Sequence, residues 1–275
     1  MTRPLIMGIL NVTPDSFSDG GRWNDPEAAV EHGLQLARSG ADIIDVGGES
    51  TRPGSARPDE REELDRVVPV VSALARARLS VSVDTMRASV AAAALEAGAD
   101  IVNDVSGGLA DPDMLPTVAG AGATYVAMHW RGHGDTMDRL AHYDDVVADV
   151  RRELLARAQA ALEAGVAAER LVLDPGFGFA KDAEHNWRLM AHLSEFVSLG
   201  HRLLVGASRK RFLGRLGEAQ EPAPPTSRDP ATAATSLLCA QAGVWAVRVH
   251  DVPSSLAAVQ VHEMVEKYAA AEGGT

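Results

Sequence analysis

The sequence predicts an α/β fold, a single (β/α)8 TIM barrel in which residues 1–275 form one domain. Short apolar runs alternate with amphipathic helical stretches along the chain, as in a barrel built from repeated strand and helix units. The apolar runs are nearly continuous, which is typical of parallel strands covered on both faces. A length of 275 residues also suits one such barrel, which takes about 250 residues.

Eight apolar runs are the predicted strands, and polar or glycine-rich sequence follows each of them. The runs are residues 5–10, 42–46, 81–83, 101–102, 125–128, 171–173, 203–205 and 244–249. In a parallel barrel the carboxyl ends of all strands open at one mouth, so the residues after the strands should surround one cavity. An open doubly wound sheet is the alternative fold, but residues 11–21 lack the glycine fingerprint that it normally carries.

The predicted helices carry apolar residues at helical spacing. The first begins at Pro26, with Asp25 as its cap, and ends at Gly40. The stripes are Val30, Leu34 and Ala37; Leu64, Val67, Val68, Val71 and Leu74; Val146, Val147, Val150, Leu154, Ala158, Ala161 and Leu162; and, in the last helix, Ala257, Val261, Met264, Val265 and Tyr268. Residues 206–211 are predicted to begin a further helix, whose first free amides suit an anion.

Two loops are too long to be plain connections. Residues 11–21 follow the first strand and residues 47–54 follow the second, and both are polar and rich in glycine. Because little apolar content holds them to the core, we expect both loops to be mobile and to bind ligand. Residues 217–227 contain three prolines and are interpreted as an exposed connection within the domain.

The formal net charge of −12 argues against nucleic acid or an anionic membrane as a partner. No segment looks like a signal peptide, and no apolar run approaches the roughly 20 residues that span a bilayer, so a cytoplasmic location is expected. Basic residues gather near predicted strand ends, where they suit phosphate or carboxylate groups. They are Arg52, Arg57, Arg209, Lys210, Arg211, Arg248 and, beside the last, His250.

Cysteine and histidine do not indicate a thiol or zinc enzyme. The single cysteine, Cys239, lies in an alanine-rich helical stretch and is interpreted as a packing residue. His129 and His133 are four residues apart, but a strand end does not stack them as a helix would. The acid of a zinc-protease motif is also missing, so zinc is not expected.

The stretch from Asp174 to Phe179 places a carboxylate at the end of a predicted strand, followed by a glycine turn and two phenylalanines. An acid beside apolar walls suits a polar heterocycle, although Asp174 as an ordinary helix cap is the alternative. Asp84 and Asn103 end two other strands. With Asp174 they suit the edge of an aminopyrimidinone ring, as in guanine or pterin, and Lys210 would compensate the buried charge.

Several stretches together resemble the dihydropteroate synthase family over almost the whole chain. They are residues 11–21 (NVTPDSFSDGG), 47–54 (GGESTRPG), 82–85 (SVDT), 103–108 (NDVSGG), 128–129 (MH), 174–179 (DPGFGF), 206–212 (GASRKRF) and 248–252 (RVHDV). The resemblance implies a transferase of folate biosynthesis that joins 6-hydroxymethyl-7,8-dihydropterin pyrophosphate to p-aminobenzoate. It also implies a dissociative mechanism, Mg2+ as cofactor, sulfonamides as inhibitors and a homodimer.

The resemblance also assigns roles to residues of this sequence. Those implied for the pterin are Asp84, Asn103, Met128, Asp174, Gly206, Lys210 and Arg248, of which Asp84, Asp174, Lys210 and Arg248 are the catalytic candidates. Those implied for pyrophosphate are Asn11, Thr51, Arg52, Arg248 and His250, with Asn11 also the metal candidate. Those implied for p-aminobenzoate are Thr51, Pro53, Phe179 and Ser208, the last receiving the carboxylate at a helix start.

Two other functions fit parts of this pattern. A folate-dependent methyltransferase domain would share the barrel and the pterin floor but would not need the two pyrophosphate loops. A catalytically silent paralogue would bind pterin or a partner without turnover. The clearest departure from the family is residues 130–134, WRGHG, with glycine where many members have proline.

Overall fold

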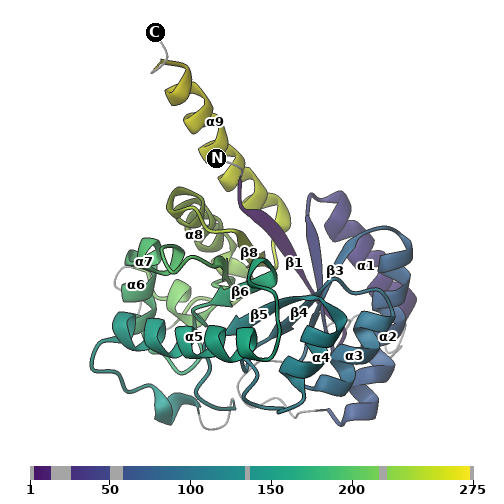
Figure 1. Cartoon of the computed structure of the whole chain (residues 1–275). Coiled ribbons are helices and arrows are strands. Elements are labelled where there is room, and N and C mark those ends of the chain that lie inside the picture. Colours follow the sequence, from purple (N-terminus) through teal and green to yellow (C-terminus); the bar gives the residue numbers. More distant parts are fainter. Residues whose placement is uncertain (1–2, 14–25, 50–57, 134–136, 217–221, 273–275) are drawn as a thin grey trace.

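The computed structural model describes residues 3–13, 26–49, 58–133, 137–216 and 222–272, and in this part of the chain eight parallel strands close a barrel in sequence order (Figure 1). The predicted TIM barrel is therefore confirmed. The strands are β1 (Leu5–Asn11), β2 (Ile43–Gly47), β3 (Ser80–Asp84), β4 (Ile101–Asp104), β5 (Thr124–Met128), β6 (Leu171–Asp174), β7 (Arg202–Val205) and β8 (Ala246–Val249).

The register of the strands brings their polar ends to one level. Asn11 pairs with Gly47, Gly47 with Asp84, and Asp84 with Asn103 along four consecutive strands. Since alternate residues of a strand face the same side, Asn11, Asn103 and Asp174 share the barrel interior with Met7, Ile101 and Val172, which lie two or four positions before them. That interior is filled by Met7, Ile43, Ile101, Val126, Val172, Leu204 and Ala246.

Helices cover the outside of the barrel and bury a larger core against the strands. They are α1 (Pro26–Arg38), α2 (Glu60–Arg76), α3 (Ala88–Glu96), α4 (Met114–Ala121), α5 (Val146–Glu163), α6 (Ala183–Ala191), α7 (Leu193–Val197), α8 (Asp229–Ala242) and α9 (Val252–Glu272). Asp145 caps α5 by accepting from the amides of Val147 and Ala148, and Asp182 forms a capping box with His185 at α6. Cys239 is buried in α8, as expected for a packing residue.

The prediction that an α-helix begins in residues 206–211 is wrong. Ser208 and Arg209 form a turn, and only a short 3-10 helix, η4 (Arg211–Gly214), follows it. Arg209 has a φ of 58°, a left-handed conformation that interrupts a right-handed helix. A bidentate ion pair with Asp229, at 2.7 Å for both bonds, holds Arg209 in place.

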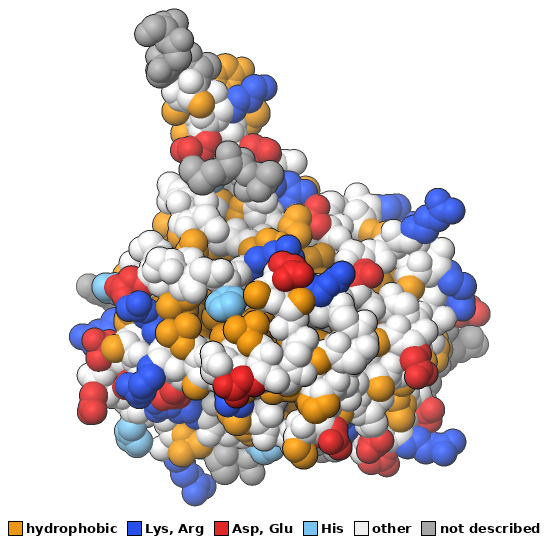
Figure 2. Space-filling model, in the orientation of Figure 1, with side chains coloured by type: hydrophobic (Ala, Val, Ile, Leu, Met, Phe, Trp, Pro, Cys, Tyr) orange, Lys and Arg blue, Asp and Glu red, His pale blue; other side chains and the backbone are white. Residues whose placement is uncertain are grey.

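The predicted apolar stripe of the last helix is also wrong. Val252 and Val259 are the fully buried apolar positions of α9, whereas Val261 and Tyr268 are 58% and 63% exposed. The reason is visible in Figure 1, where the second half of α9 extends past the barrel and has no strand beneath it. Figure 2 shows hydrophobic side chains on this projecting part of the helix.

Residues 14–25 and 50–57 lie outside the described part of the chain, and they contain most of the two long loops, 11–21 and 47–54. Their expected mobility therefore stays a prediction. Among the described residues, no helix is long and apolar enough to cross a membrane.

Candidate active site

Three predicted residues form a buried polar floor at the mouth of the barrel. Asp84, Asn103 and Asp174 stand at or next to the ends of β3, β4 and β6, and each is less than 10% exposed. Burial raises the pKa of Asp174 to about 6, opposed by the hydrogen bond from the Gly176 amide to its Oδ1 (2.7 Å). Burial also raises the pKa of Asp84 to about 7, opposed by the nearby Arg248 guanidinium.

Arg248 crosses the barrel from β8 and binds two acids of the floor. Its Nε donates to Asp45 Oδ2 at 2.5 Å and its Nη2 donates to Asp84 Oδ2 at 2.6 Å. The Asn103 amide also donates to Asp45 Oδ2, at 3.1 Å. Asp45 is therefore the hub of the floor, although the sequence analysis did not single it out. Its signal was a lone acid inside an apolar strand, on the same face as the inward-pointing Ile43.

Lys210 stands over the aromatic wall of the site. Its Nζ lies 4.0 Å from the centroid of the Phe179 ring, a distance that permits a cation–π interaction. Burial lowers the pKa of Lys210 to about 8, and the positive charge of Arg248 lowers it further. A Cβ at Gly178 would lie 2.8 Å from the Lys210 side chain, so the turn needs glycine there to admit the lysine.

Gly206 and Met128 line the same cavity. A Cβ on Gly206 would sit 3.6 Å from Asp174 Oδ2 and 3.9 Å from the Arg248 Cβ, which places Gly206 between these two floor residues. Met128 belongs to a small apolar cluster that also contains Met86 and Val105, with Phe179 packed against it. Met86 and Val105 follow polar strand ends, and neither was predicted from the sequence as a wall residue.

Ser208 and His250, predicted for different parts of the ligand, are in contact. Ser208 Oγ lies 2.9 Å from His250 Nδ1 and accepts from the His250 amide at 3.2 Å. Asn11 ends β1, and Gly47 of β2 lies between it and Asp84. A Cβ on Gly47 would be 3.7 Å from Asp84 Oδ2 and 3.8 Å from Asn11 Oδ1. Both oxygens therefore face the same space above Gly47.

Three predicted residues, Thr51, Arg52 and Pro53, lie outside the described residues. All the other predicted site residues lie at the barrel mouth, on or directly after β1, β3, β4, β5, β6, β7 and β8. The arrangement can accept hydrogen bonds from a flat ring at the floor and meet an anion beside it.

Two buried carboxylates and an amide under an aromatic wall, in the mouth of a TIM barrel, define a class of protein that binds a flat heterocycle rich in N–H donors. The family model described as "Pterin binding enzyme" matches residues 7–250. A dihydropteroate synthase of Mycobacterium leprae is 55% identical over 259 residues, 93% of this chain and 91% of that protein. The chain therefore belongs to the dihydropteroate synthases, within the pterin binding enzyme family.

Solved structures agree with this assignment. The dihydropteroate synthase of Xanthomonas albilineans with 4-aminobenzoic acid has a TM-score of 0.89 and 46% identity, covering 96% of this chain and 93% of that one. The Yersinia pestis dihydropteroate synthase in a sulfonamide drug complex also has a TM-score of 0.89, at 43% identity, covering 96% of this chain and 95% of that one. The predicted family, fold and enzyme class are confirmed.

Proposed function

We propose that this barrel joins 6-hydroxymethyl-7,8-dihydropterin pyrophosphate to p-aminobenzoate, releasing 7,8-dihydropteroate and pyrophosphate. The observation that carries the proposal is the buried floor of Asp84, Asn103 and Asp174, each less than 10% exposed, beside Lys210. Carboxylates accept hydrogen bonds from the ring N–H and amino groups, and the Asn103 amide both donates and accepts. Gly206 leaves room for the ring beside Asp174.

The pyrophosphate of the substrate would lie between Arg248, His250 and Asn11, with Thr51 and Arg52 of the second loop completing the site. Arg248 and His250 are one residue apart across the end of β8, so both side chains reach the same part of the mouth. In the structure Arg248 binds Asp45 and Asp84. We infer that its positive charge compensates these acids in the empty site and that it turns toward phosphate oxygens when the ring donors take over Asp84.

The reaction would be dissociative. The bond from the pterin methylene to the pyrophosphate oxygen breaks, and its electron pair leaves with pyrophosphate. The resulting methylene cation is delocalised into the ring, where the Asp84 and Asp174 carboxylates stabilise positive charge. The amine lone pair of p-aminobenzoate then forms the new C–N bond and the amine loses a proton. Phe179, Pro53 and Thr51 would hold the aryl ring, and Ser208 its carboxylate.

Magnesium fits the residues present at the pyrophosphate end. Asn11 Oδ1, which faces the space above Gly47, is a hard donor that suits this ion, and Mg2+ commonly takes its remaining ligands from substrate phosphates. Asn11 would hold the ion through Oδ1. Bound there, the ion would supply positive charge against the charge that develops on the leaving group.

The test is a coupled assay of pyrophosphate release with both substrates, with and without a chelator. Release that requires p-aminobenzoate and yields dihydropteroate supports the proposal. Binding of pterin without release would favour the silent paralogue, and methyl transfer from a folate would favour the methyltransferase domain. A sulfonamide, which copies the arylamine of p-aminobenzoate, is expected to inhibit by competition with it.

A further inference from the structure

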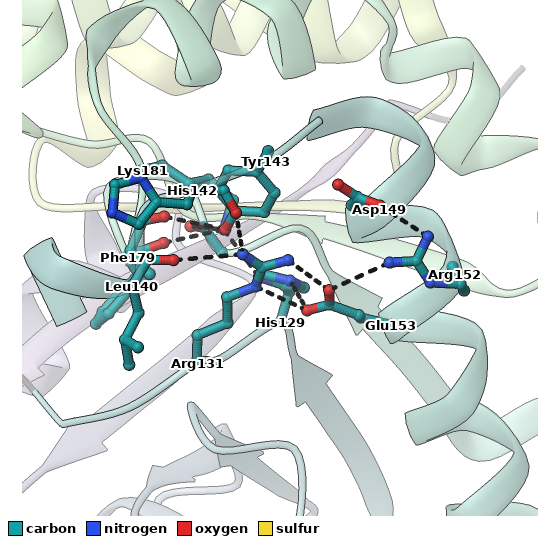
Figure 3. A network of polar contacts seen from close by, with 12 residues as sticks. His129, Arg131, Leu140, His142, Tyr143, Asp149, Arg152, Glu153, Phe179 and Lys181 are labelled. Atoms are coloured by element: carbon teal, nitrogen blue, oxygen red, sulfur yellow. Dashed lines mark hydrogen bonds and ion pairs between the residues drawn. The ribbon is translucent and has the colours of Figure 1, made fainter. Parts of the chain in front are cut away.

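A network of polar side chains begins at Lys181, which donates to the carbonyl oxygens of Gly176 and Phe179, and continues through His129 to Glu153 (Figure 3). Lys181 Nζ lies 2.9 Å from His129 Nδ1, and His129 Nε2 lies 2.8 Å from Glu153 Oε2. Arg131 binds both oxygens of Glu153, at 3.0 and 2.5 Å. Lys181 and His129 are buried, whereas Glu153 reaches the surface of α5. The proposed chemistry uses none of these side chains.

The positions of the hydrogens in this network follow from the chemistry of its side chains. An ammonium has three hydrogens and no lone pair, so Lys181 donates to His129 Nδ1, which must accept. His129 therefore carries its hydrogen on Nε2 and donates it to Glu153. Burial lowers the pKa of His129 to about 4, assisted by the Lys181 charge, which keeps the ring neutral in this tautomer. The two remaining Lys181 hydrogens go to the carbonyl oxygens of Gly176 and Phe179, both at 3.0 Å.

Those two carbonyls bracket the turn that joins the pterin floor to the aryl wall. Gly176 also donates to Asp174 Oδ1 at 2.7 Å, and the Phe179 amide donates to the Gly176 carbonyl at 3.1 Å. The turn contains one disfavoured residue, because Ala180 has a φ of 47°, a left-handed conformation that costs energy for a residue with a side chain, whereas Gly176 and Gly178 adopt positive φ freely. Its shape therefore depends on the contacts that hold it.

Burying an ammonium costs several kcal/mol unless hydrogen bonds and charges compensate it. Lys181 has three acceptors, and although burial lowers its pKa to about 7, the Asp174 carboxylate is the strongest influence that opposes this. A solvated surface lysine would need neither. Lys181 binds the backbone carbonyls of Gly176 and Phe179 in the turn that follows Asp174, which indicates a role in catalysis through geometry.

We propose that Lys181 is a positioning residue of the proposed synthase: it holds the Phe179 ring at a set distance from the Asp174 carboxylate, so that the arylamine meets the bound pterin. His129 and Glu153 orient its ammonium. Asp174 is also fixed by β6 itself, whereas Phe179 is five residues further along the turn. Loss of Lys181 therefore displaces the aryl wall more than the pterin floor.

The test compares Lys181→Met with Tyr143→Phe in steady-state kinetics with each substrate varied. Tyr143 donates to the Ala180 carbonyl at 3.0 Å, so its variant removes one bond to the same turn without touching Gly176 or Phe179. We expect Lys181→Met to raise KM for p-aminobenzoate by about 10- to 100-fold, since small misplacements have effects of this size, and KM for the pterin substrate by less than about threefold. Tyr143→Phe should change neither by more than about threefold.

A second variant, Glu153→Ala, frees the outer end of the chain at a partly exposed position and should fold in any case. It should raise KM for p-aminobenzoate in the same direction by a smaller factor. Equal rises in both KM values, equal effects of Tyr143→Phe, or no change in any variant would overturn the positioning role. Absence of wild-type turnover would count against the proposed function alone, and the positioning role would then be decided by calorimetric titration, in which Lys181→Met should weaken binding of p-aminobenzoate and leave binding of the pterin substrate within about threefold.

Discussion

At the residue scale, burial raises the pKa of Asp174 to about 6 and that of Asp84 to about 7, so both carboxylates depend on a cation or a ligand donor to compensate their charge. Asp84 already has the Arg248 guanidinium at 2.6 Å, whereas Asp174 accepts from a backbone amide. The two acids are therefore not equivalent. Asp174 depends more on the ligand for compensation of its charge, so it is the more sensitive position for substitution.

Asp174→Asn should abolish turnover while the fold remains intact. The amide keeps an oxygen that can accept from Gly176, but it presents N–H donors toward the ring donors of the pterin. The measurement is pyrophosphate release together with circular dichroism and thermal unfolding. Turnover within a few-fold of wild type would remove Asp174 from the site.

The pH dependence of Asp174 should have opposite signs for activity and stability. Its folded-state pKa of about 6 lies above the ordinary value of 3.8, so the folded protein binds more protons than the unfolded chain between these values. Its contribution to the free energy of unfolding therefore falls as the pH rises through this window and is constant above it. The kcat/KM for the pterin substrate should rise over the same window, as the carboxylate forms.

This prediction is checked by urea unfolding and steady-state kinetics at pH values from about 4.5 to about 7.5, in steps of about half a unit. Asp174→Asn serves as the control for stability, because it cannot titrate and should lose this component of the slope. An identical pH dependence of unfolding in both proteins would mean that Asp174 titrates near its ordinary pKa.

Arg248→Ala should affect both activity and stability. Removing the guanidinium leaves Asp45 and Asp84 buried without their cation, which typically costs about 3–5 kcal/mol. It should also lower kcat/KM by about 10²-fold or more through lost stabilisation of the leaving pyrophosphate. Arg248→Lys, which keeps the charge but loses the fork to two acids, should recover part of the stability. A loss of stability with unchanged kcat/KM would make Arg248 structural.

At the scale of elements, the turn after β6 depends on its glycines. A Cβ on Gly176 would lie 2.4 Å from the His129 carbonyl oxygen, and its φ of 70° disfavours any side chain. Both effects involve backbone, which cannot move aside cheaply. The same turn is held on its other side by Lys181, so a shift here would displace Phe179 as well.

Gly176→Ala is therefore expected to lower the free energy of unfolding by more than about 1 kcal/mol, the usual cost of the left-handed conformation alone. Gly120→Ala is the matched control, because Gly120 lies in α4 with nothing within 4 Å of an added Cβ, and it should be neutral or stabilising. Chemical unfolding of both variants decides the matter. Equal stabilities would mean that the turn relaxes without cost.

The same scale explains what the sequence could predict. Strand positions follow from apolar runs, and a polar residue at a strand end of a barrel must face the mouth or the helices, which is how Asp84, Asn103 and Asp174 were found. Asn103 faces Asp45 inside, whereas its neighbour Asp104 faces outward and accepts from Tyr125 at 2.8 Å. Local pattern does not distinguish such neighbours until the register is known.

Other features depend on contacts distant in sequence. Asp45 stands out in the sequence only as a lone acid in an apolar strand, and its role follows from Arg248, 203 positions away, which lies against it. In the sequence Lys181 looks like an ordinary lysine next to a helix, and only the fold shows that it contacts His129. The helix expected after β7 failed because Arg209 is held in a left-handed turn by Asp229, which no helical periodicity reports.

At the scale of the whole molecule, α9 is the part that the barrel does not explain. Val261, Met264, Val265 and Tyr268 are each about half exposed or more, and they recur at helical spacing. A projecting helix of this length is marginal in water without a packing partner. This spacing is typical of a buried helix face. A second copy of the chain could bury it.

We therefore expect a homodimer in which the projecting parts of two α9 helices pack on each other around a twofold axis, since a self-complementary apolar face suits an isologous interface. Val265→Glu, which places a charge on this face at a residue 60% exposed in one chain, should shift the mass in sedimentation equilibrium from dimer to monomer. Leu155→Glu on α5, at an exposed apolar residue away from α9, should leave the dimer intact. If the wild type sediments as a monomer, or if Leu155→Glu dissociates it and Val265→Glu does not, the second half of α9 is not the dimer surface.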